Sequence, residues 1–247
     1  MDNAMMREFV FNVMFNLERA VATIINFLLP QVCVVCKAKA ESNLCVRCRT
    51  KLPRINYGCT CCGRELSQNA LICGECLKHP PPFTHTIAPF FYAPPIDQLI
   101  IALKFHGHLL NAKLLGELLA EHLSTYYRNH PKPELIIPVP LHRTRLQERG
   151  FNQALEIAKP IAKKLNLPLE RYHCKRIKNT AAQTSLTAEE RHANVKKAFL
   201  IAGKIPAHIA VIDDVVTTGS TIVEFCKALR CSGAITIDVW CCAKSGF

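Results

Sequence analysis

The sequence predicts an α/β protein, a parallel sheet flanked by helices, with a small N-terminal Cys-rich zinc-ribbon module. Three observations predict this architecture. Strand-like and helix-like segments alternate from about residue 86 onward, the usual order in a parallel sheet with helices on both faces. Nine of the 14 cysteines lie between Cys33 and Cys76. A run of three prolines beginning at Pro80 separates these cysteines from the alternating segments.

The composition fits one or two folded domains. The 247 residues correspond to roughly 1.6 domains of about 150 residues each. With 49% hydrophobic residues, the chain can bury enough surface to exclude disorder as its main state. We predict an N-terminal helix within residues 1–30, the Cys-rich module over 31–80 and the sheet domain over 86–247.

The first expected elements follow the proline run. Thr86–Tyr92 is predicted to be a short strand, and Ile96–Phe105 a helix that stops near Gly107. A second helix is predicted to run to about Arg128. Its leucines recur every three or four residues and so form one apolar face: Leu110, Leu114, Leu115, Leu118 and Leu119.

The remaining elements continue the alternation. Glu134–Pro140 reads as a short apolar strand entering a loop, and Gln153–Leu165 as a helix with Pro160 as an obstacle inside it. A polar stretch follows over 175–197. The β-branched apolar run of His208–Asp213 predicts a buried strand. A helix over about 220–231 and a final strand over 234–241 complete the order.

Four Cys-x-x-Cys pairs within fifty residues predict two zinc sites. Two such pairs place four sulfurs around one ion at about 2.3 Å and leave no open position, so the metal would be structural. We expect the first pair to join the second and the third to join the fourth; interleaved pairing, disulfides and an iron–sulfur cluster are alternatives. Cys61 is surplus and stays unassigned. The predicted zinc ligands are Cys33, Cys36, Cys45, Cys48, Cys59, Cys62, Cys73 and Cys76.

The chain is strongly basic, with 31 Lys and Arg against 19 Asp and Glu and a formal net charge of +12. Two zinc tetrathiolate sites would lower it to about +8. This excess indicates an anionic partner such as phosphate, nucleic acid or an acidic membrane surface. Within the module, Tyr57 could stack on bases, and the cations could contact a nucleic-acid backbone or simply offset the thiolates. These cations are Lys37, Lys39, Arg47, Arg49, Lys51, Arg54 and Arg64.

The apolar stretch over 20–29 is too short to cross a bilayer. Acidic Asp2, Glu8 and Glu18 do not fit the basic start of a secretory signal, so we expect a cytoplasmic protein. A helix from about Met6 to Leu29 would dock on its own domain or on a partner. The weaker alternative is a membrane surface, which would make the protein peripheral at the inner membrane.

Two adjacent acids followed by a hydroxyl-rich loop form the most informative stretch. Asp213 and Asp214 follow an apolar strand, and their carboxylates can accept hydrogen bonds from vicinal hydroxyls. The next loop opens a helix whose free N–H groups and hydroxyls suit a phosphate, with Gly219 allowing close backbone approach. A ribose 5-phosphate matches this layout. The predicted loop residues are Val215, Thr217, Thr218, Gly219, Ser220 and Thr221.

This stretch resembles the signature of type I phosphoribosyltransferases. The resemblance implies that Asp213 and Asp214 are catalytic residues that hold the ribose 2- and 3-hydroxyls of phosphoribosyl pyrophosphate, while the loop binds its 5-phosphate. It also implies Mg²⁺ on the diphosphate and an oxocarbenium-like centre that the carboxylates stabilise as pyrophosphate departs. No residue from Val239 to Phe247 indicates the acceptor.

A second stretch, Ile137–His142 with the basic residues that follow it, is similar to the ComF family associated with bacterial competence, as is the Cys-rich module. The resemblance implies a flexible loop over 180–199 that closes on the diphosphate and brings Arg191 or Lys196 to the leaving group. Lys104 also resembles a Leu-Lys segment of the family, but we interpret it as a helix lysine extending toward solvent. The pyrophosphate-loop residues implied are Val139, Pro140 and Leu141, with Arg145 and Arg149 facing the diphosphate.

The ComF resemblance implies a competence protein that handles incoming single-stranded DNA during natural transformation and carries a phosphoribosyl pyrophosphate site. One alternative is an active phosphoribosyltransferase that transfers ribose 5-phosphate to an unidentified base or amine, without direct DNA binding. In a third interpretation, the Cys-rich module docks on a competence ATPase, a translocase or another DNA-uptake protein.

Overall fold

The structure, a computed structural model, describes residues 31–66, 70–178 and 198–245. The predicted N-terminal helix and most of the predicted flexible loop, Arg191 and Lys196 included, lie outside these residues. The chain divides into two compact units, Met1–Lys51 and Leu52–Phe247, which are described separately. The boundaries predicted from the sequence, 1–30, 31–80 and 86–247, stay a prediction.

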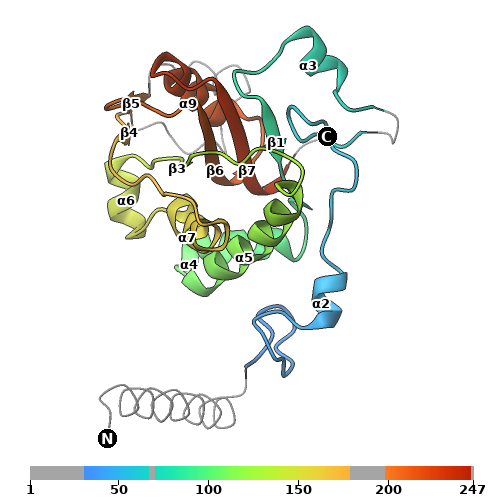
Figure 1. The fold of residues 1–247 in the computed structure, drawn as a ribbon. Helices are drawn as coiled ribbons and strands as arrows, with labels where there is room; N and C mark the ends of the chain where they lie inside the picture. The colour runs from blue at the N-terminus through green and yellow to red at the C-terminus, as the bar shows by residue number, and fades with distance from the viewer. Residues whose placement is uncertain (1–30, 67–69, 179–197, 246–247) are drawn as a thin grey trace, which may run out of the picture. The chain divides into compact units, whose positions relative to one another are not determined.

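A parallel sheet forms the centre of the second unit (Figure 1). Its strand order is β1-β7-β6-β3, and β2 also pairs with β7. All these pairings are parallel, which confirms the predicted α/β architecture. The strands are β1 (His85–Ile87), β2 (Phe90–Phe91), β3 (Leu135–Pro138), β6 (His208–Val216) and β7 (Thr236–Lys244).

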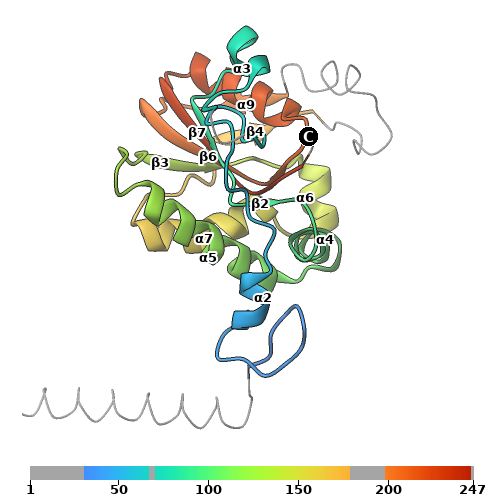
Figure 2. The ribbon, with the colours of Figure 1, turned by 90° about the vertical axis from the view of Figure 1, so that its right-hand side faces the viewer.

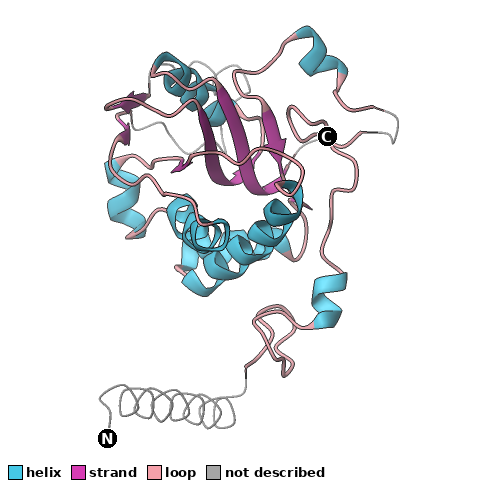
Figure 3. Cartoon of the chain, in the orientation of Figure 1, coloured by secondary structure: helices cyan, strands magenta, loops and turns pink. Residues whose placement is uncertain are grey.

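Helices cover both faces of this sheet (Figures 2 and 3). On one face, α9 (Ser220–Cys231) buries Phe225 and Leu229 against apolar side chains of β6 and β7. The other face is covered by α4 (Ile96–His106), α5 (Leu109–Tyr126) and α7 (Gln153–Leu165). Within the described ranges, none of the helices combines the length and the apolar character needed to cross a bilayer.

Helix α7 continues through Pro160, which the sequence marks as an obstacle. The proline ring fits because α5 presents Gly116 at this point. A Cβ at Gly116 would lie 2.4 Å from the Ile157 carbonyl oxygen and 2.5 Å from Pro160 Cγ. The missing side chain therefore allows α5 and α7 to pack closely around the proline.

The structure differs from the expected elements in two places. The strand predicted over Thr86–Tyr92 is broken into β1 and β2, because Pro89 has no N–H to donate to the ladder. A short helix and a strand pair appear in segments predicted as loop or polar coil. These are α6 (Arg143–Arg149), β4 (Cys174–Arg176) and β5 (Phe199–Ile201), the last two paired antiparallel.

The third and fourth Cys-x-x-Cys pairs belong to the same unit as the sheet. Thr86 of β1 donates its backbone N–H to the Thr60 carbonyl at 2.9 Å and its hydroxyl to the Cys61 carbonyl at 2.7 Å. The short helix α3 (Gly74–Lys78) carries the last of these cysteines. Backbone hydrogen bonds therefore fix this part of the Cys-rich segment to the edge of the sheet.

Candidate functional site

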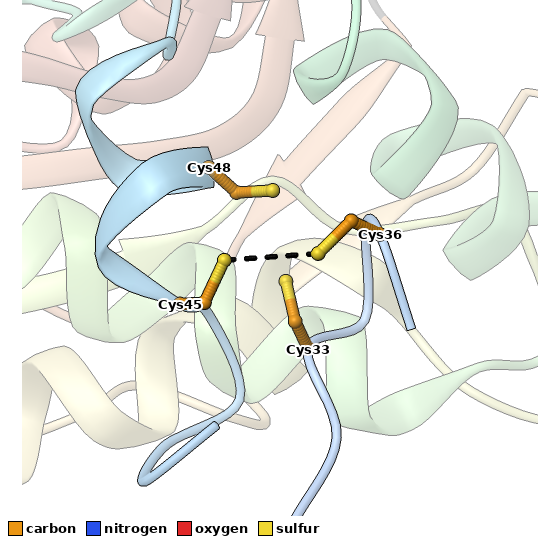
Figure 4. A group of neighbouring side chains, drawn as sticks. All are labelled: Cys33, Cys36, Cys45 and Cys48. Atoms are coloured by element: carbon orange, nitrogen blue, oxygen red, sulfur yellow. Dashed lines mark hydrogen bonds between the residues drawn. The ribbon is translucent and has the colours of Figure 1, made fainter. Parts of the chain in front are cut away.

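The eight predicted zinc ligands form two groups of four. Within each group, the Sγ atoms lie within 4.8 Å of one another. Cys33, Cys36, Cys45 and Cys48 form the first group, in which Cys45 precedes α2 (Val46–Thr50), and Figure 4 shows their sulfurs turned toward one centre. The pairing is sequential, as expected, rather than interleaved. Two closed groups of four cysteines fit two structural zinc ions.

The second group consists of Cys59, Cys62, Cys73 and Cys76. The distance between the Cys62 and Cys73 sulfurs is 3.7 Å, far longer than a disulfide bond of about 2.05 Å. Cys61 stands outside the quartet, and its carbonyl accepts the hydrogen bond from Thr86. Cys61, which neither quartet uses, is therefore a residue through which the ribbon is attached to the sheet.

Backbone N–H groups favour the thiolate form of one cysteine in each quartet, whereas burial raises the pKa of Cys48 and Cys76. Burial acts to raise the pKa of the Cys33 thiol, but N–H groups of Cys36, Cys45 and Val35 outweigh it and lower the pKa to about 6. Cys59 has the same arrangement, in which N–H groups overcome burial and bring its pKa to about 7. A thiolate stabilised in this way is the form that binds zinc.

The acid pair, Asp213 and Asp214, lies where β6 extends past the end of β3. Pro138, the last residue of β3, pairs with Ile212. On its other side β6 remains paired with β7 as far as Val216, so the strand is longer than predicted and includes Val215. Asp214 is only 4% exposed, while Asp213 is partly exposed. The acids therefore face an edge of the sheet that β3 leaves open.

Burial and the neighbouring carboxylate shift the pKa of Asp213. Burial and the Asp214 carboxylate raise the pKa of Asp213 to about 7, although Lys104, the backbone N–H of Asp214 and Arg176 act to lower it. Asp213 accepts the Asp214 N–H at 2.9 Å, and Asp214 accepts the N–H of Val215 at 2.7 Å. These bonds fix the carboxylates at the strand end.

Lys104 is the clearest site residue that the sequence interpretation missed. Its Nζ lies 2.9 Å from Asp214 Oδ1, so the side chain points inward rather than extending into solvent. The interpretation as a solvent-facing helix lysine is therefore wrong. No local pattern reveals the contact, since Lys104 and Asp214 meet only through the packing of α4 near the end of β6.

The hydroxyl loop, Thr217–Thr221, connects β6 to α9. Gly219 precedes the helix with a φ of 77°, a left-handed conformation that glycine adopts without steric cost. Thr217 and Thr218 are exposed, and Thr218 Oγ1 lies 3.1 Å from the Ser220 hydroxyl. The first N–H groups of a helix have no intrahelical partner. The loop thus presents hydroxyls and N–H groups suited to an anion.

Lys244 connects this loop with its neighbours. Its ammonium donates to the carbonyl of Thr217 at 2.7 Å and to that of Ser245 at 3.0 Å. Its Cδ passes 3.9 Å from the position that a Cβ would take at Gly63, beside the second cysteine group. The end of β7 therefore supports the hydroxyl loop next to the second ribbon.

The predicted pyrophosphate-loop residues, Val139, Pro140 and Leu141, follow β3 at the same sheet edge as the acid pair. The N–H of Val139 donates to Ile212 at 2.9 Å, and its carbonyl accepts from the Asn152 amide at 3.0 Å. Residues from Val139 to Leu141 therefore leave the sheet directly beside the acids. The loop after β3 and the stretch from Asp213 onward therefore leave neighbouring strands at the same end of the sheet.

Arginines approach the acid pair from two further elements. Arg145 and Arg149 lie on α6. Burial and the neighbouring Arg145 lower the pKa of Arg149, while the charges of the acid pair act to raise it. Arg176 of β4 was not predicted. Its pKa is lowered by burial and by Arg145, while Asp213 acts in the opposite direction. A bridge to His142 and the pairing of β4 with β5 place it here, and no local sequence signal identifies it.

Comparison with known proteins agrees with this arrangement. Residues 24–77 match the family model described as a double zinc ribbon domain. Competence protein F of Haemophilus influenzae is 35% identical over 86% of this chain and 96% of its own length. DNA utilization protein YhgH of Salmonella typhi is 33% identical over 88% and 98%, and competence protein ComFC of Bacillus subtilis is 26% identical over 74% and 76%.

Solved structures similar to this chain include two phosphoribosyltransferases. The adenine phosphoribosyltransferase of Leishmania donovani is 13% identical, with a TM-score of 0.36 over 68% of this chain and 86% of that one. The purine phosphoribosyltransferase of Pyrococcus horikoshii is 19% identical, with a TM-score of 0.30 over 66% and 86%. The α/β fold of this chain is shown by its own parallel strand order, β1-β7-β6-β3.

The parallel sheet with helices on both faces and the two four-cysteine groups define an α/β protein with an N-terminal double zinc ribbon. Within that class, the chain belongs to the competence protein F family, which also includes the YhgH and ComFC proteins.

The unequal attachment of the two cysteine groups gives a first prediction. Cys59→Ser should reduce bound zinc from two ions to one and lower the unfolding temperature of the sheet unit by on the order of 5–10 °C, because that ribbon is bonded to β1. Cys36→Ser should also remove one zinc but leave this transition unchanged. Zinc analysis and thermal unfolding followed by fluorescence of the buried Trp240 measure both effects. Equal shifts for the two variants would contradict the prediction.

The raised pKa of Asp213 gives a second prediction. Its pKa is about 7 in the folded protein against an ordinary 3.8, so the folded state holds the proton more tightly. The resulting stabilisation is present below pH 4 and is lost as the pH rises through 7. Asp213→Asn should therefore raise the midpoint of urea unfolding relative to the wild type at pH 8, and by a smaller amount at pH 5. A gain that is larger at pH 5 would show that the acid is not destabilised when ionised.

Proposed function

We propose that this chain is a competence-type protein that handles incoming single-stranded DNA during natural transformation and binds phosphoribosyl pyrophosphate with Mg²⁺ at the acid pair. The observation that carries the proposal is the meeting of the acid pair, the hydroxyl loop and the loop after β3 at one sheet edge. Cationic side chains from three other elements surround this edge.

Each part of the site would contact a different part of the ligand. Asp213 and Asp214 would accept hydrogen bonds from the ribose 2- and 3-hydroxyls. The hydroxyl loop with Val215 would hold the 5-phosphate through hydroxyls and N–H groups at the start of α9. Val139, Pro140 and Leu141, with Arg145, Arg149 and Arg191, would face the diphosphate. We add Arg176 to these cations because the structure places it near Arg145 and Asp213.

The donor set also fits a magnesium ion. Carboxylate oxygens together with phosphate oxygens are the ligands that Mg²⁺ prefers, and the acid pair provides the carboxylates. When bound, Mg²⁺ would neutralise part of the charge on the diphosphate. The chain itself would position the ribose, and the cations of α6 and β4 would face the departing pyrophosphate.

Two findings support the DNA-handling half of the proposal. Proteins named competence protein F and DNA utilization protein are similar to this chain over nearly their whole lengths. The formal charge of +12 suits a polyanion. The first ribbon groups with residues up to Lys51 rather than with the sheet, which suits a separate docking role toward a competence ATPase, a translocase or another DNA-uptake protein.

The residues gathered at the strand end also suit a second candidate. An active phosphoribosyltransferase would transfer ribose 5-phosphate to an unidentified base or amine, without direct DNA binding. The acid pair, the hydroxyl loop and the surrounding cations are all present for such a reaction. Consumption of phosphoribosyl pyrophosphate that depends on an added acceptor would distinguish this candidate from a site that only binds.

Calorimetric titration tests the ligand site directly. Phosphoribosyl pyrophosphate with Mg²⁺ should bind the wild type, and the double variant Asp213→Asn, Asp214→Asn should bind at least ~100-fold more weakly, because two charged hydrogen bonds are lost. Asp97→Asn, at the opposite end of α4 from Lys104, serves as the matched control. Binding that is equal in the wild type and the double variant would refute the assignment of the site.

Fluorescence anisotropy with a labelled oligothymidylate tests the second half. We expect the affinity to fall with salt, with a slope of log K against log salt of about −2 to −3.5, equivalent to three to five neutralised phosphates. A duplex of the same length provides the comparison and should bind more weakly. Absence of binding to the single strand, or binding without salt dependence, would refute DNA handling by this chain.

A further inference from the structure

We propose that Phe105, at the C-terminal end of α4, is a stacking platform for an unpaired base of single-stranded DNA at the mouth of the acid-pair site. The inference rests on the DNA-handling half of the proposed function and names the contact surface. Three observations carry it. The Phe105 ring is exposed, the Arg149 guanidinium lies over that ring, and the preceding residue, Lys104, contacts Asp214 of the acid pair.

Phe105 is exposed to an extent that packing does not explain. The residue is 68% exposed, although it follows Lys104, whose ammonium is held by Asp214. The helix is closed behind it by Gly107, with a φ of 65°, whose N–H donates to the Ala102 carbonyl. The ring is therefore presented by a firmly anchored helix end, so little ordering entropy would be lost when a base stacks on it.

The second feature is a cation that already lies over the ring. The Arg149 guanidinium carbon is 5.7 Å from the centre of the Phe105 ring, and the two residues come from α6 and α4. Arg149 also lies close enough to Asp213 and Asp214 for their charges to act on its pKa. A ring that contacts a guanidinium and remains largely in solvent can accept a base through stacking and cation–π contacts.

The surroundings of the ring match a nucleic acid strand. Ile101, one turn earlier on α4, is 41% exposed, and Leu146, one turn before Arg149 on α6, is 43% exposed. The same two helices carry further cations: Lys104 on α4, whose ammonium is held by Asp214, and Arg145 on α6 beside Arg149. Exposed apolar side chains next to the Arg149 guanidinium suit the bases and phosphates of a nucleic acid strand, whereas an apolar protein helix would gain nothing from the cation.

The position relates the strand to the ligand site. Because Lys104 contacts Asp214 while its neighbour Phe105 faces solvent, a base on the platform would lie at the opening of the acid-pair site. Stacking reads no base edge, so the platform would accept any base. The expected ligand is therefore a single strand of any sequence. Duplex DNA should bind more weakly because its bases are already stacked and cannot use the platform.

The test measures oligothymidylate binding by the full-length chain. Phe105→Ala should weaken binding by about 5- to 150-fold, corresponding to the loss of one stacked base, and should leave the salt slope unchanged because no charge is removed. Tyr172→Ala removes another exposed aromatic, 76% exposed and outside α4 and α6, and should change the affinity less than twofold. A thermal unfolding transition unchanged from that of the wild type, followed by the fluorescence of the buried Trp240, shows that Phe105→Ala is folded.

Phe105→Trp provides a direct spectroscopic readout. The chain has one tryptophan, Trp240, which is fully buried in β7, so new fluorescence in the variant is assigned to the substituted position. The single strand should bind this variant at least as well as the wild type and should quench that fluorescence. In the wild type the fluorescence should not change.

The outcomes separate the inference from the proposed function. If the wild type binds the single strand and Phe105→Ala binds equally well, the platform is wrong and DNA handling stands. If Phe105→Ala weakens binding but the strand leaves the fluorescence of Phe105→Trp unchanged, the residue does not stack on a base and the inference also fails. If the wild type does not bind the strand, the DNA-handling proposal itself is refuted.

Discussion

The parallel pairing of β6 between β3 and β7 is the constraint on which the candidate site depends. The pairing fixes Asp213 opposite Cys241, while the pairing with β3 ends one residue earlier at Ile212, so the acids emerge at an edge that only β7 still supports. Because parallel strands deliver their carboxyl ends to the same edge, the loops after β3 and β6 must meet there.

The opposite end of the same strands is held by a buried polar network. Asp238 of β7 is 2% exposed and accepts hydrogen bonds from Tyr127 at 2.6 Å and from His85 and His208 at 2.9 Å. Tyr127 in turn accepts a bond from the Trp240 indole at 3.0 Å. These contacts join β1, β6, β7 and the end of α5, and a buried carboxylate with three partners is tolerated because each contact offsets its desolvation. Because this network holds the starts of the strands, the loops at their carboxyl ends are not needed to hold the sheet together and can contact a ligand.

Two lysines and the second cysteine group hold the parts of the site to the sheet unit. Lys104 supplies a positive charge inside the acid pair, without which two neighbouring carboxylates would repel each other at the end of a buried strand. Lys244 holds the hydroxyl loop next to the second ribbon, whose Cys61 carbonyl is bonded to β1. The second zinc group thereby becomes part of the sheet unit, whereas the first belongs to the preceding unit. Two ribbons of similar spacing in the sequence therefore have different structural roles.

By itself, the sequence determined the features that depend on neighbouring residues. Cys-x-x-Cys spacing defined both zinc quartets, apolar runs gave the strands of the sheet, and the stretch from Asp213 to Thr221 indicated the strand-end site, because each signal lies within a few residues. The inward turn of Lys104, the approach of Arg176 through a bridge to His142 and the exposure of Phe105 beneath Arg149 were decided only by the tertiary structure. Each of these contacts joins residues distant in the chain, and the packing of helices on a twisted sheet sets their geometry, which no local pattern records.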